Sequence, residues 1–530
     1  MKGGMDTAIG TPETTEHRAE GPGIPFSGST RRFPASPPQI GLGPLFLALA
    51  LAGLVATSAC GRTPSTGQAS LHACASDEGP PDARCGTLRV FEDRVRGTGR
   101  SISLAIVVLP ALSDDDRADP LVFLAGGPGQ GAAKMAPLIR AAFSRIQRHR
   151  DIVLVDQRGT GRSHPLNCEP KDDSLKSLLA DDDVSLARLR ECLDGYDADP
   201  RLYTTTVAMD DLEDVRSFLG YSKVNLYGGS YGTRAALVYL RQHPQSVRSV
   251  ILDGVAPTDM RLPLFAARDA GRALDQVLVD CEKDAGCAAA YPGLRVKVTE
   301  MLSRLERSPV EVTLIHPLAG TPEKVTVTPR VIAGALLSGL YSTATASMVP
   351  LLLERATRND FQSLIALALA GDQSENMSTG MQLSVLCSED ASQVDDDDVT
   401  QASSHSLFGR HLAAGQLAAC RLWPRGSVPA AYFEPVVSEV PALVLSGDLD
   451  PVTPPAWGEA VVRHLRNGRH FIATATGHGV ATTPCGLRVV EDFLDKGSAS
   501  QLDASCLTAP RRPPFFVTPS GPAPSVAPPS

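Results

Sequence analysis

Several features that mark other classes of protein are missing from this 530-residue sequence. The chain carries no excess of basic residues, and its formal net charge of -9 weighs against a nucleic-acid partner. It has no C-x-x-C pair to suggest a zinc site, and no internal repeats. Its acidic runs, at 114–116, 181–183 and 395–398, lack the alternating ligand spacing of a calcium loop. What remains is the composition of an ordinary globular enzyme, 43% hydrophobic and 21% charged, with room for one elaborated domain or two.

The first 60 residues contain no apolar run long enough to span a membrane. Residues 1–40 are rich in Gly, Pro, Ser and Thr, and the apolar run from Leu45 to Ala56 is too short to cross a bilayer comfortably. The run ends in small residues, as an export signal does. Cys60 follows Ser-Ala, as at a bacterial lipoprotein cleavage site, although Thr57 stands where Leu is usual. The sequence therefore predicts an exported protein, which is periplasmic, secreted or anchored to a membrane through a lipidated Cys60.

The cysteines agree with export. Without Cys60 ten remain, and an even number in an exported chain suggests disulfides. They fall into sequence neighbours, so local pairing is the simplest expectation: 74 with 85, 168 with 192, 281 with 287, 387 with 420, and 485 with 506.

Short apolar, β-branched runs alternate with helical patterns over the first half of the chain. This alternation predicts an α/β fold, a mostly parallel sheet with helices on both faces. An antiparallel pair is expected to open the sheet. The expected strands are 88–91, 102–109, 121–124, 152–155, 224–227 and 250–252, with helices at 134–148 and 206–218.

The alternation stops between residues 258 and 435. This stretch is helix-rich, with at most one hairpin near Val310 to Val327, and strand signals return at 442–446 and 471–475. An insertion between two strands of one sheet predicts a large helical cap over the active-site face. The predicted division is a leader at 1–60, a core in two parts at 61–257 and 436–508, the cap at 258–435, and a proline-rich tail at 509–530 that we expect to be disordered.

Ser230 lies in Gly-Gly-Ser-Tyr-Gly, between an apolar run and a helical pattern. In that setting G-x-S-x-G predicts a serine on a tight strand-to-helix turn, where flanking glycines remove the Cβ atoms that would clash. The alternative is a glycine-rich loop with an incidental serine. The strand before the motif and the helix after it favour a nucleophile.

A serine nucleophile needs a base, and the base needs a group that orients it. Asp450 follows one late strand and His478 the next, which gives the order Ser, Asp, His. Asp448 lies closer to its strand and competes for the acid's role. Asp450 lies three residues after Gly447 and four before Pro454, which matches the pattern G-x-x-D-x-x-x-P of the hydrolase family that the motifs below resemble, and this resemblance favours Asp450.

The oxyanion of the intermediate needs preplaced N–H donors. We expect one from Tyr231 and one from Gly127 or Gly126, in the loop Gly-Gly-Pro-Gly-Gln-Gly at 126–131. The same loop also fits G-x-G-x-x-A before a helix, with Asp156 ending the next strand, which outlines a dinucleotide fingerprint. That alternative leaves Ser230, Asp450 and His478 unused.

Four motifs in order resemble those of the proline iminopeptidase and tripeptidyl aminopeptidase group of α/β-hydrolases, with similarity from about residue 86 to 508. They are GGPGQG, DQRGTGRS at 156–163, GGSYGT and GDLDPVTP. The resemblance implies a serine exopeptidase that acts on peptides with free N-termini and needs no metal or organic cofactor. One departure is Ala125, where proline iminopeptidases have His before Gly-Gly-Pro-Gly, so strict proline specificity is not implied.

An aminopeptidase also needs an anion for the substrate's ammonium group, and in this group of enzymes acidic cap residues supply it. The resemblance points to Glu389 and Asp390, whereas an exposed acidic turn is the other interpretation. The segment Asp156 to Ser163 is expected to be a structural turn, with Arg158 and Arg162 in internal ion pairs.

The sequence therefore predicts an exported serine hydrolase, an aminopeptidase of prolyl or tripeptidyl type that acts on peptide substrates through an acyl-enzyme. A small-molecule carboxylesterase with the same triad is the first alternative. A secreted binding protein on an inactive hydrolase scaffold, and a nucleotide-binding oxidoreductase, are the others.

Overall fold

The computed structural model describes residues 71–113, 118–169, 172–179, 182–370, 376–509 and 511–523, all within one compact unit. The predicted leader and Cys60 lie outside the described residues. Across the described segments, no helix combines the length and the hydrophobicity that crossing a membrane would require.

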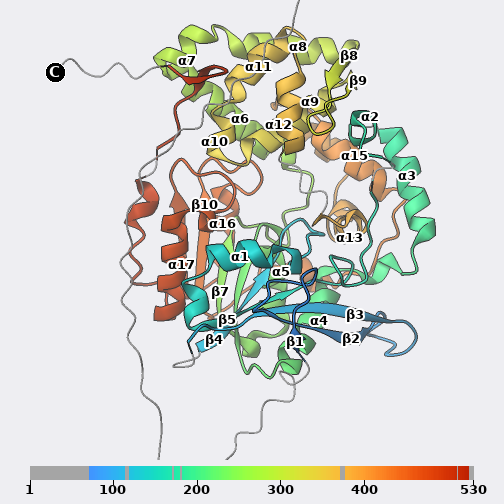
Figure 1. Cartoon of the computed structure of the whole chain (residues 1–530), viewed down its shortest axis with the longest axis vertical. Helices are drawn as coiled ribbons and strands as arrows, with labels where there is room; N and C mark the ends of the chain where they lie inside the picture. Colours follow the sequence, from blue (N-terminus) through green and yellow to red (C-terminus); the bar gives the residue numbers. More distant parts are fainter. Residues whose placement is uncertain are drawn as a thin grey trace, which may run out of the picture. The chain divides into compact units, whose positions relative to one another are not determined.

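A nine-stranded sheet forms the centre of the fold, in the order β1-β2-β3-β5-β4-β6-β7-β10-β11 (Figure 1). The first three strands are antiparallel, as expected for the opening pair, and the strands from β5 to β11 run parallel. The α/β-hydrolase arrangement predicted from the sequence is therefore confirmed. The strands are β1 (His72–Ala73), β2 (Arg84–Phe91), β3 (Ser101–Leu109), β4 (Ala118–Leu124), β5 (Arg150–Val155), β6 (Val224–Gly229), β7 (Val247–Asp253), β10 (Ala442–Gly447) and β11 (Gly468–Ala473).

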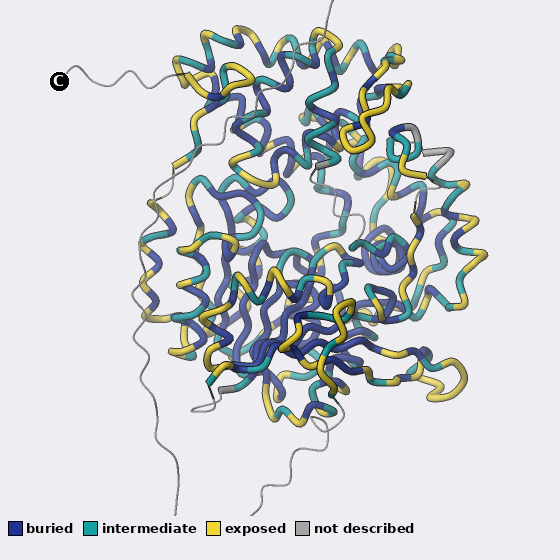
Figure 2. Tube along the Cα trace, viewed as in Figure 1, coloured by how far each residue is buried: buried dark blue, intermediate teal, exposed yellow. Residues whose placement is uncertain are grey.

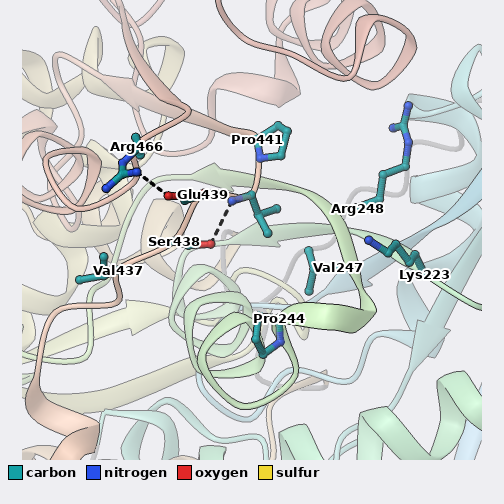
Figure 3. Close-up of a pocket in the computed structure, with 10 residues that line it drawn as sticks. Lys223, Pro244, Val247, Arg248, Val437, Ser438, Glu439, Pro441 and Arg466 are labelled. Carbon is teal, nitrogen blue, oxygen red and sulfur yellow. Dashed lines mark hydrogen bonds and ion pairs between the residues drawn. The ribbon is translucent and has the colours of Figure 1, made fainter.

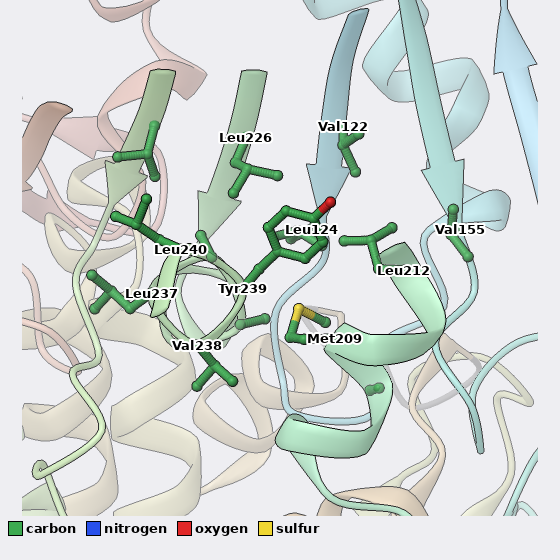
Figure 4. Packing of buried hydrophobic residues seen from close by; sticks show 14 of the residues in the cluster. Val122, Leu124, Val155, Met209, Leu212, Leu226, Leu237, Val238, Tyr239 and Leu240 are labelled. Atoms are coloured by element: carbon green, nitrogen blue, oxygen red, sulfur yellow. The ribbon is translucent and has the colours of Figure 1, made fainter. Parts of the chain in front are cut away.

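Helices cover both faces because the central strands are apolar on both sides. Alternate residues of β5 enter different cores: Val153 packs in one, and Ile152 and Leu154 in the other. The first core contains α4 (Thr205–Phe218), α5 (Tyr231–Gln242) and α16 (Pro455–Val462); the second contains α1 (Ala136–Ala142) and α17 (Pro484–Lys496). Figure 4 shows α4 and α5 packed on the first face, and Figure 2 shows the central strands of the sheet buried.

The cap lies between β7 and β10 and has a core of its own. Its longest helix, α6 (Ala266–Lys283), buries Ala270, Leu274, Val277 and Cys281, the spacing of one helical face. The expected hairpin is present as β8 (Val310–Ile315) and β9 (Pro322–Val327). The other cap helices are α7 (Ala285–Ala290), α8 (Leu294–Arg307), α9 (Pro329–Leu340), α10 (Thr343–Ala346), α11 (Val349–Thr357), α12 (Gln362–Ala370), α13 (Thr379–Val385), α14 (Asp396–Ser403) and α15 (His411–Cys420).

A second segment joins the cap, outside the stretch 258–435 expected from sequence. Helices α2 (Leu175–Leu178) and α3 (Asp182–Gly195), which follow β5, pack against it. Leu175 is buried in the cap core, and its N–H donates to the Glu323 carboxylate at 2.8 Å. Leu189 of α3 packs in one cluster with Leu417 of α15.

All five expected disulfides are confirmed: Cys74–Cys85, Cys168–Cys192, Cys281–Cys287, Cys387–Cys420 and Cys485–Cys506. Each closes a loop of at most 33 residues in sequence separation, within one part of the fold.

The proline-rich tail differs from the expected disorder at residues 511–523. It forms the small ladder β12 (Phe516–Thr518) with β13 (Gly521–Pro522) and packs on the cap. Phe515 is buried in the cap core, and Tyr291 donates its hydroxyl to the carbonyl of Phe516 at 2.8 Å. Proline content misled the expectation, because a buried aromatic side chain and an ion pair between Arg512 and Asp280 attach this segment to the cap.

A chain that ends at Thr508 should be less stable than the full chain, by about 3 kcal/mol, the typical loss for a deleted buried Phe. Thermal unfolding followed by circular dichroism measures the difference. A chain that ends at Ala523, which keeps Phe515, is the matched control and should unfold with the full chain. Equal midpoints for the two truncations would show that the tail adds no stability.

Candidate active site

Ser230 occupies the turn between β6 and α5 with φ 56° and ψ −126°, a conformation that L-residues rarely adopt. Glycines make the turn possible: a Cβ at Gly228 would collide with the carbonyl of Gly232, and one at Gly232 with that of Leu124. The Ser230 N–H donates to the carbonyl of Asp253 at 2.9 Å, which fixes the turn to β7. The sequence motif thus forms the predicted strand-to-helix elbow.

His478 and Asp450 come together at the ends of β10 and β11. His478 Nδ1 lies 2.8 Å from Asp450 Oδ2, and the Asp450 side chain is fully buried. Asp450 Oδ1 accepts the N–H groups of Val452 and Thr453, each at 2.8 Å. The Thr453 hydroxyl donates to Asp450 Oδ2 at 2.9 Å and lies 3.1 Å from His478 Nδ1.

Each member of this pair favours the charged form of the other. Burial raises the pKa of Asp450, but His478 and the donors from Thr453 and Val452 outweigh it, so the pKa lies below its ordinary value. Burial lowers the pKa of His478, but Asp450 outweighs it, so the pKa lies above 6.5. This is the electrostatic setting of a histidine that must accept a proton.

The rival acid, Asp448, points elsewhere. Its carboxylate accepts the N–H of Thr476 at 3.2 Å, a bond that shapes the loop before His478. The structure therefore brings Asp450, and not Asp448, to the imidazole.

Two neighbours enclose His478. The backbone N–H of His478 donates to the carbonyl of the cap residue Tyr341 at 2.9 Å. The ring of Tyr341 meets the imidazole of His478 edge-on, with ring centroids 5.2 Å apart. On the core side, a Cβ placed on Gly254 would lie 3.1 Å from His478 Cε1. Gly254 follows Asp253, whose carbonyl accepts the Ser230 N–H, so the end of β7 contacts both the serine and the histidine.

The loop 126–131 lies against the elbow. A Cβ on Gly126 would lie 3.3 Å from Ser230 Cβ. The Gly126 N–H already donates to Gln130 Oε1, at 3.2 Å. The N–H groups of Gly127 and Tyr231 donate to no residue in the described part of the chain, which leaves them available to an oxyanion.

Hydrogen bonds hold this loop and the residues that directly follow it. Asp156, fully buried after β5, accepts the N–H groups of Ala133 and Arg162 at 2.8 and 2.9 Å. From the cap, Ser378 donates its N–H to the carbonyl of Gly129 at 2.9 Å. A carboxylate that is occupied in this way is closed to a ribose hydroxyl, which removes the basis of the dinucleotide alternative.

The turn that starts at Asp156 carries the expected ion pairs. Arg158 is fully buried and grips Asp211 through Nε at 2.6 Å and Nη2 at 2.9 Å. Arg162 lies 3.6 Å from the carboxylate of Glu78.

Glu389 and Asp390 are not placed as expected, and the structure corrects the idea that they line the cleft. Both are fully buried beneath the nucleophile helix. Glu389 accepts the N–H and hydroxyl of Thr205, at 2.6 and 2.8 Å, and the hydroxyl of Tyr432. Asp390 pairs with Arg234 of α5 at 2.8 Å. Protein donors contact both carboxylates, and neither side chain is exposed at the surface.

This buried network has an electrostatic cost. Burial raises the pKa of Glu389 to about 7, although Arg234 acts against it. The Thr205 hydroxyl also bonds the hydroxyl of Tyr231 at 2.6 Å. The acidic pair therefore braces the start of α5 instead of facing a substrate.

Sequence reasoning missed three contributors to the site: Thr453, Arg234 and Asp253. Each had a signal. Arg234 lies one helical turn after Ser230, Thr453 lies in the motif of the acid, and Asp253 ends a strand as Asp156 and Asp450 follow theirs.

Two surface pockets lie away from this site. One of about 550 Å³ lies at the starts of β6, β7 and β10, the opposite edge of the sheet, and is lined by Lys223, Arg248 and Arg466 among others (Figure 3). Arg466 is paired there with Glu439. Within the described residues, no group of three or more His, Cys, Asp or Glu side chains is arranged to hold a metal ion.

The chain is similar to known hydrolases over most of its length. Residues 119–278 match a family model described as alpha/beta hydrolase fold, and residues 405–506 match one described as TAP-like protein. The serine protease Hip1 of Mycobacterium tuberculosis (strain ATCC 25618 / H37Rv) is 26% identical over 460 residues, which cover 81% of this chain and 88% of Hip1. The tripeptidyl aminopeptidase of Streptomyces coelicolor is 24% identical over 468 residues, 82% of this chain and 85% of its own.

A shorter match is stronger in identity. The proline iminopeptidase of Neisseria gonorrhoeae is 34% identical over 136 residues, 26% of this chain and 32% of its own. These matches confirm the resemblance seen in the motifs. With its sheet, its nucleophile elbow and these relatives, the chain is a serine hydrolase of the α/β-hydrolase fold, similar to tripeptidyl aminopeptidases and to the serine protease Hip1.

Proposed function

We propose that this chain is an exported serine aminopeptidase that removes amino acids or short peptides from free N-termini. The observation that carries the proposal is the pair His478–Asp450, held at the strand ends beside the strained turn of Ser230. A buried carboxylate that orients an imidazole has its main chemical use next to a nucleophile.

In the proposed mechanism, His478 takes the proton of Ser230 as the hydroxyl oxygen attacks the carbonyl carbon of the scissile peptide bond. Asp450 holds the imidazole through Nδ1 and stabilises the imidazolium. The N–H groups of Gly127 and Tyr231 donate to the oxyanion. His478 then gives the proton to the leaving amine, and water, activated by the same imidazole, releases the acyl-enzyme.

The choice of an aminopeptidase is supported by the printed names of two relatives, a tripeptidyl aminopeptidase and a proline iminopeptidase. The large cap also fits a peptide substrate, because it meets the site directly at Tyr341 and Ser378. Export is supported by five disulfides, which form in oxidising compartments, and by the leader in the sequence. Attachment to a membrane through a lipidated Cys60 stays part of the proposal.

Ser230→Ala should reduce turnover by about 10⁵-fold or more, because the nucleophile is lost. Peptide hydrolysis and labelling with a fluorophosphonate probe measure the effect. The wild-type chain should label at one site and the variant should not label, with unchanged circular dichroism. Turnover retained in the variant would exclude Ser230 as the nucleophile.

Asp450→Asn should lower kcat by about 10⁴-fold, and Asp448→Asn, two residues away, should have little effect. Asp450 raises the pKa of His478, and the base acts in its neutral form. The pH profile of wild-type kcat/KM should therefore have an acid limb, the range over which kcat/KM rises as His478 loses its proton, centred above pH 6.5. The Asp450→Asn variant should move that limb to lower pH. Equal losses in the two variants would mean that Asp450 is not the specific partner of His478.

A free N-terminus should be required. Aminoacyl and tripeptidyl naphthylamides should be cleaved, whereas the same compounds with an acetylated amine should be cleaved at least about tenfold more slowly, since acetylation removes the positive charge by which an aminopeptidase recognises its substrate, and the loss of one charge-assisted contact costs more than about 1 kcal/mol. Small acyl esters test the carboxylesterase alternative. Rapid ester hydrolysis together with equal cleavage of free and blocked peptides would favour the esterase.

A further inference from the structure

We propose that Asp253 is a positioning residue for the hydrolysis: its carboxylate holds the loop that carries His478, while its backbone carbonyl holds Ser230. This inference rests on the proposed function, in which those two residues are base and nucleophile. Asp253 would then set the spacing between them without touching the substrate.

The carboxylate of Asp253 grips the loop directly after His478. Oδ1 accepts the N–H of Val480 at 2.7 Å, and Oδ2 accepts the N–H of Ala481 at 2.8 Å. These two residues open a short 3₁₀ helix, and helix N-terminal N–H groups have no partner within their own helix. Asp253 therefore decides where the segment after the base is anchored.

The backbone of Asp253 grips the nucleophile. Its carbonyl accepts the Ser230 N–H at 2.9 Å, and in the ladder of β6 and β7 it lies opposite Gly229. The next residue, Gly254, has φ 71° and lies so close to His478 that a Cβ would come within 3.4 Å of Nδ1. Asp253 therefore contacts both the turn of Ser230, through its carbonyl, and the loop of His478, through its carboxylate.

The hydrogen-bond partners of Asp253 favour its anion, whereas its burial disfavours it. The side chain is buried, and its described partners are all donors: two backbone N–H groups and the hydroxyl of Tyr227, 2.8 Å from Oδ2. Tyr227 and His478 are the titratable groups that act on it, and burial outweighs them so that its pKa lies above the ordinary value. The negative charge of Asp253 adds to that of Asp450 in raising the pKa of His478. The imidazole of His478 also contacts the ring of Tyr341.

Asp253→Asn tests the assignment. The amide keeps the shape, removes the charge, and can accept only one of the two backbone bonds. We expect kcat to fall by about 10- to 100-fold with KM within about twofold, because the base is misplaced while the cleft is intact. The acid limb of kcat/KM should move to lower pH, since a negative charge near the imidazole is gone. Titration with a fluorophosphonate corrects each rate for the fraction of active sites.

The matched control is Asp151→Asn. Asp151 is also buried and also accepts one backbone N–H, from Ala111 at 2.8 Å, and one tyrosine hydroxyl, from Tyr221 at 2.7 Å. It lies at the start of β5, the opposite edge of the sheet from the site. Any loss of stability should be similar in the two variants. Asp151→Asn should nevertheless leave unchanged both the acid limb of kcat/KM and the kcat corrected for the fraction of active sites.

A second measurement separates this proposal from the proposed function. The titration of the His478 imidazole is followed by NMR in a Ser230→Ala background, where no turnover is needed. Asp253→Asn should lower the pKa of His478, and Asp253→Ser, whose smaller side chain admits water to the two N–H groups, should do the same. An unchanged His478 titration, or a corrected kcat equal to that of the wild type, would overturn the role of Asp253. Turnover that survives Ser230→Ala would overturn the proposed function instead, and the NMR titration would still report whether Asp253 acts on His478.

Discussion

The site depends on buried carboxylates that accept backbone N–H groups at the ends of parallel strands. Asp253 at the end of β7 and Asp450 after β10 each accept two N–H groups of one loop, and Asp156 after β5 accepts one N–H just after the oxyanion loop and one from its own turn. A buried anion is costly unless donors surround it, so each of these loops can adopt few other arrangements without leaving the charge unpaired. The three loops carry the oxyanion donor, the base and the acid, and carboxylates at the ends of the sheet strands hold them in position.

The cap and the core share a second charged joint. Arg234 of the nucleophile helix is fully buried against Asp390, and Glu389 bonds to Thr205 at the start of α4. The disulfide Cys387–Cys420 holds this part of the cap chain close by. Since breaking a buried ion pair leaves an uncompensated charge, these contacts stabilise the attachment of this cap segment to α5. Residues that seemed suited to binding a substrate therefore contribute to alignment.

Most of the core was predictable because its signals are local. Alternating runs gave the strands, a glycine pattern located the turn of Ser230, and the distance from Gly447 to Pro454 separated Asp450 from Asp448. The pairing of the cysteines was also predictable, because each disulfide joins cysteines that are neighbours in the sequence.

What sequence reasoning missed depends on contacts between distant residues. Glu389 carries no local sign that Thr205, 184 positions away, will bury it. The same holds for α3, which joins the cap through packing, and for Phe515, whose burial outweighs the proline content around it. Charge in a cap segment shows that a carboxylate exists, but only tertiary packing decides whether it faces water or a helix.

The carbonyl of Tyr341 has a consequence for how such enzymes diverge. It accepts the His478 N–H, so a main-chain atom of the cap completes the loop of the base. Ser378 does the same for the oxyanion loop through its own N–H. A cap transplanted from a relative would therefore change the chemistry along with the substrate preference, unless the backbone at these two points were preserved. New specificities in this architecture should arise more readily by substitution within the cap than by exchange of the whole cap.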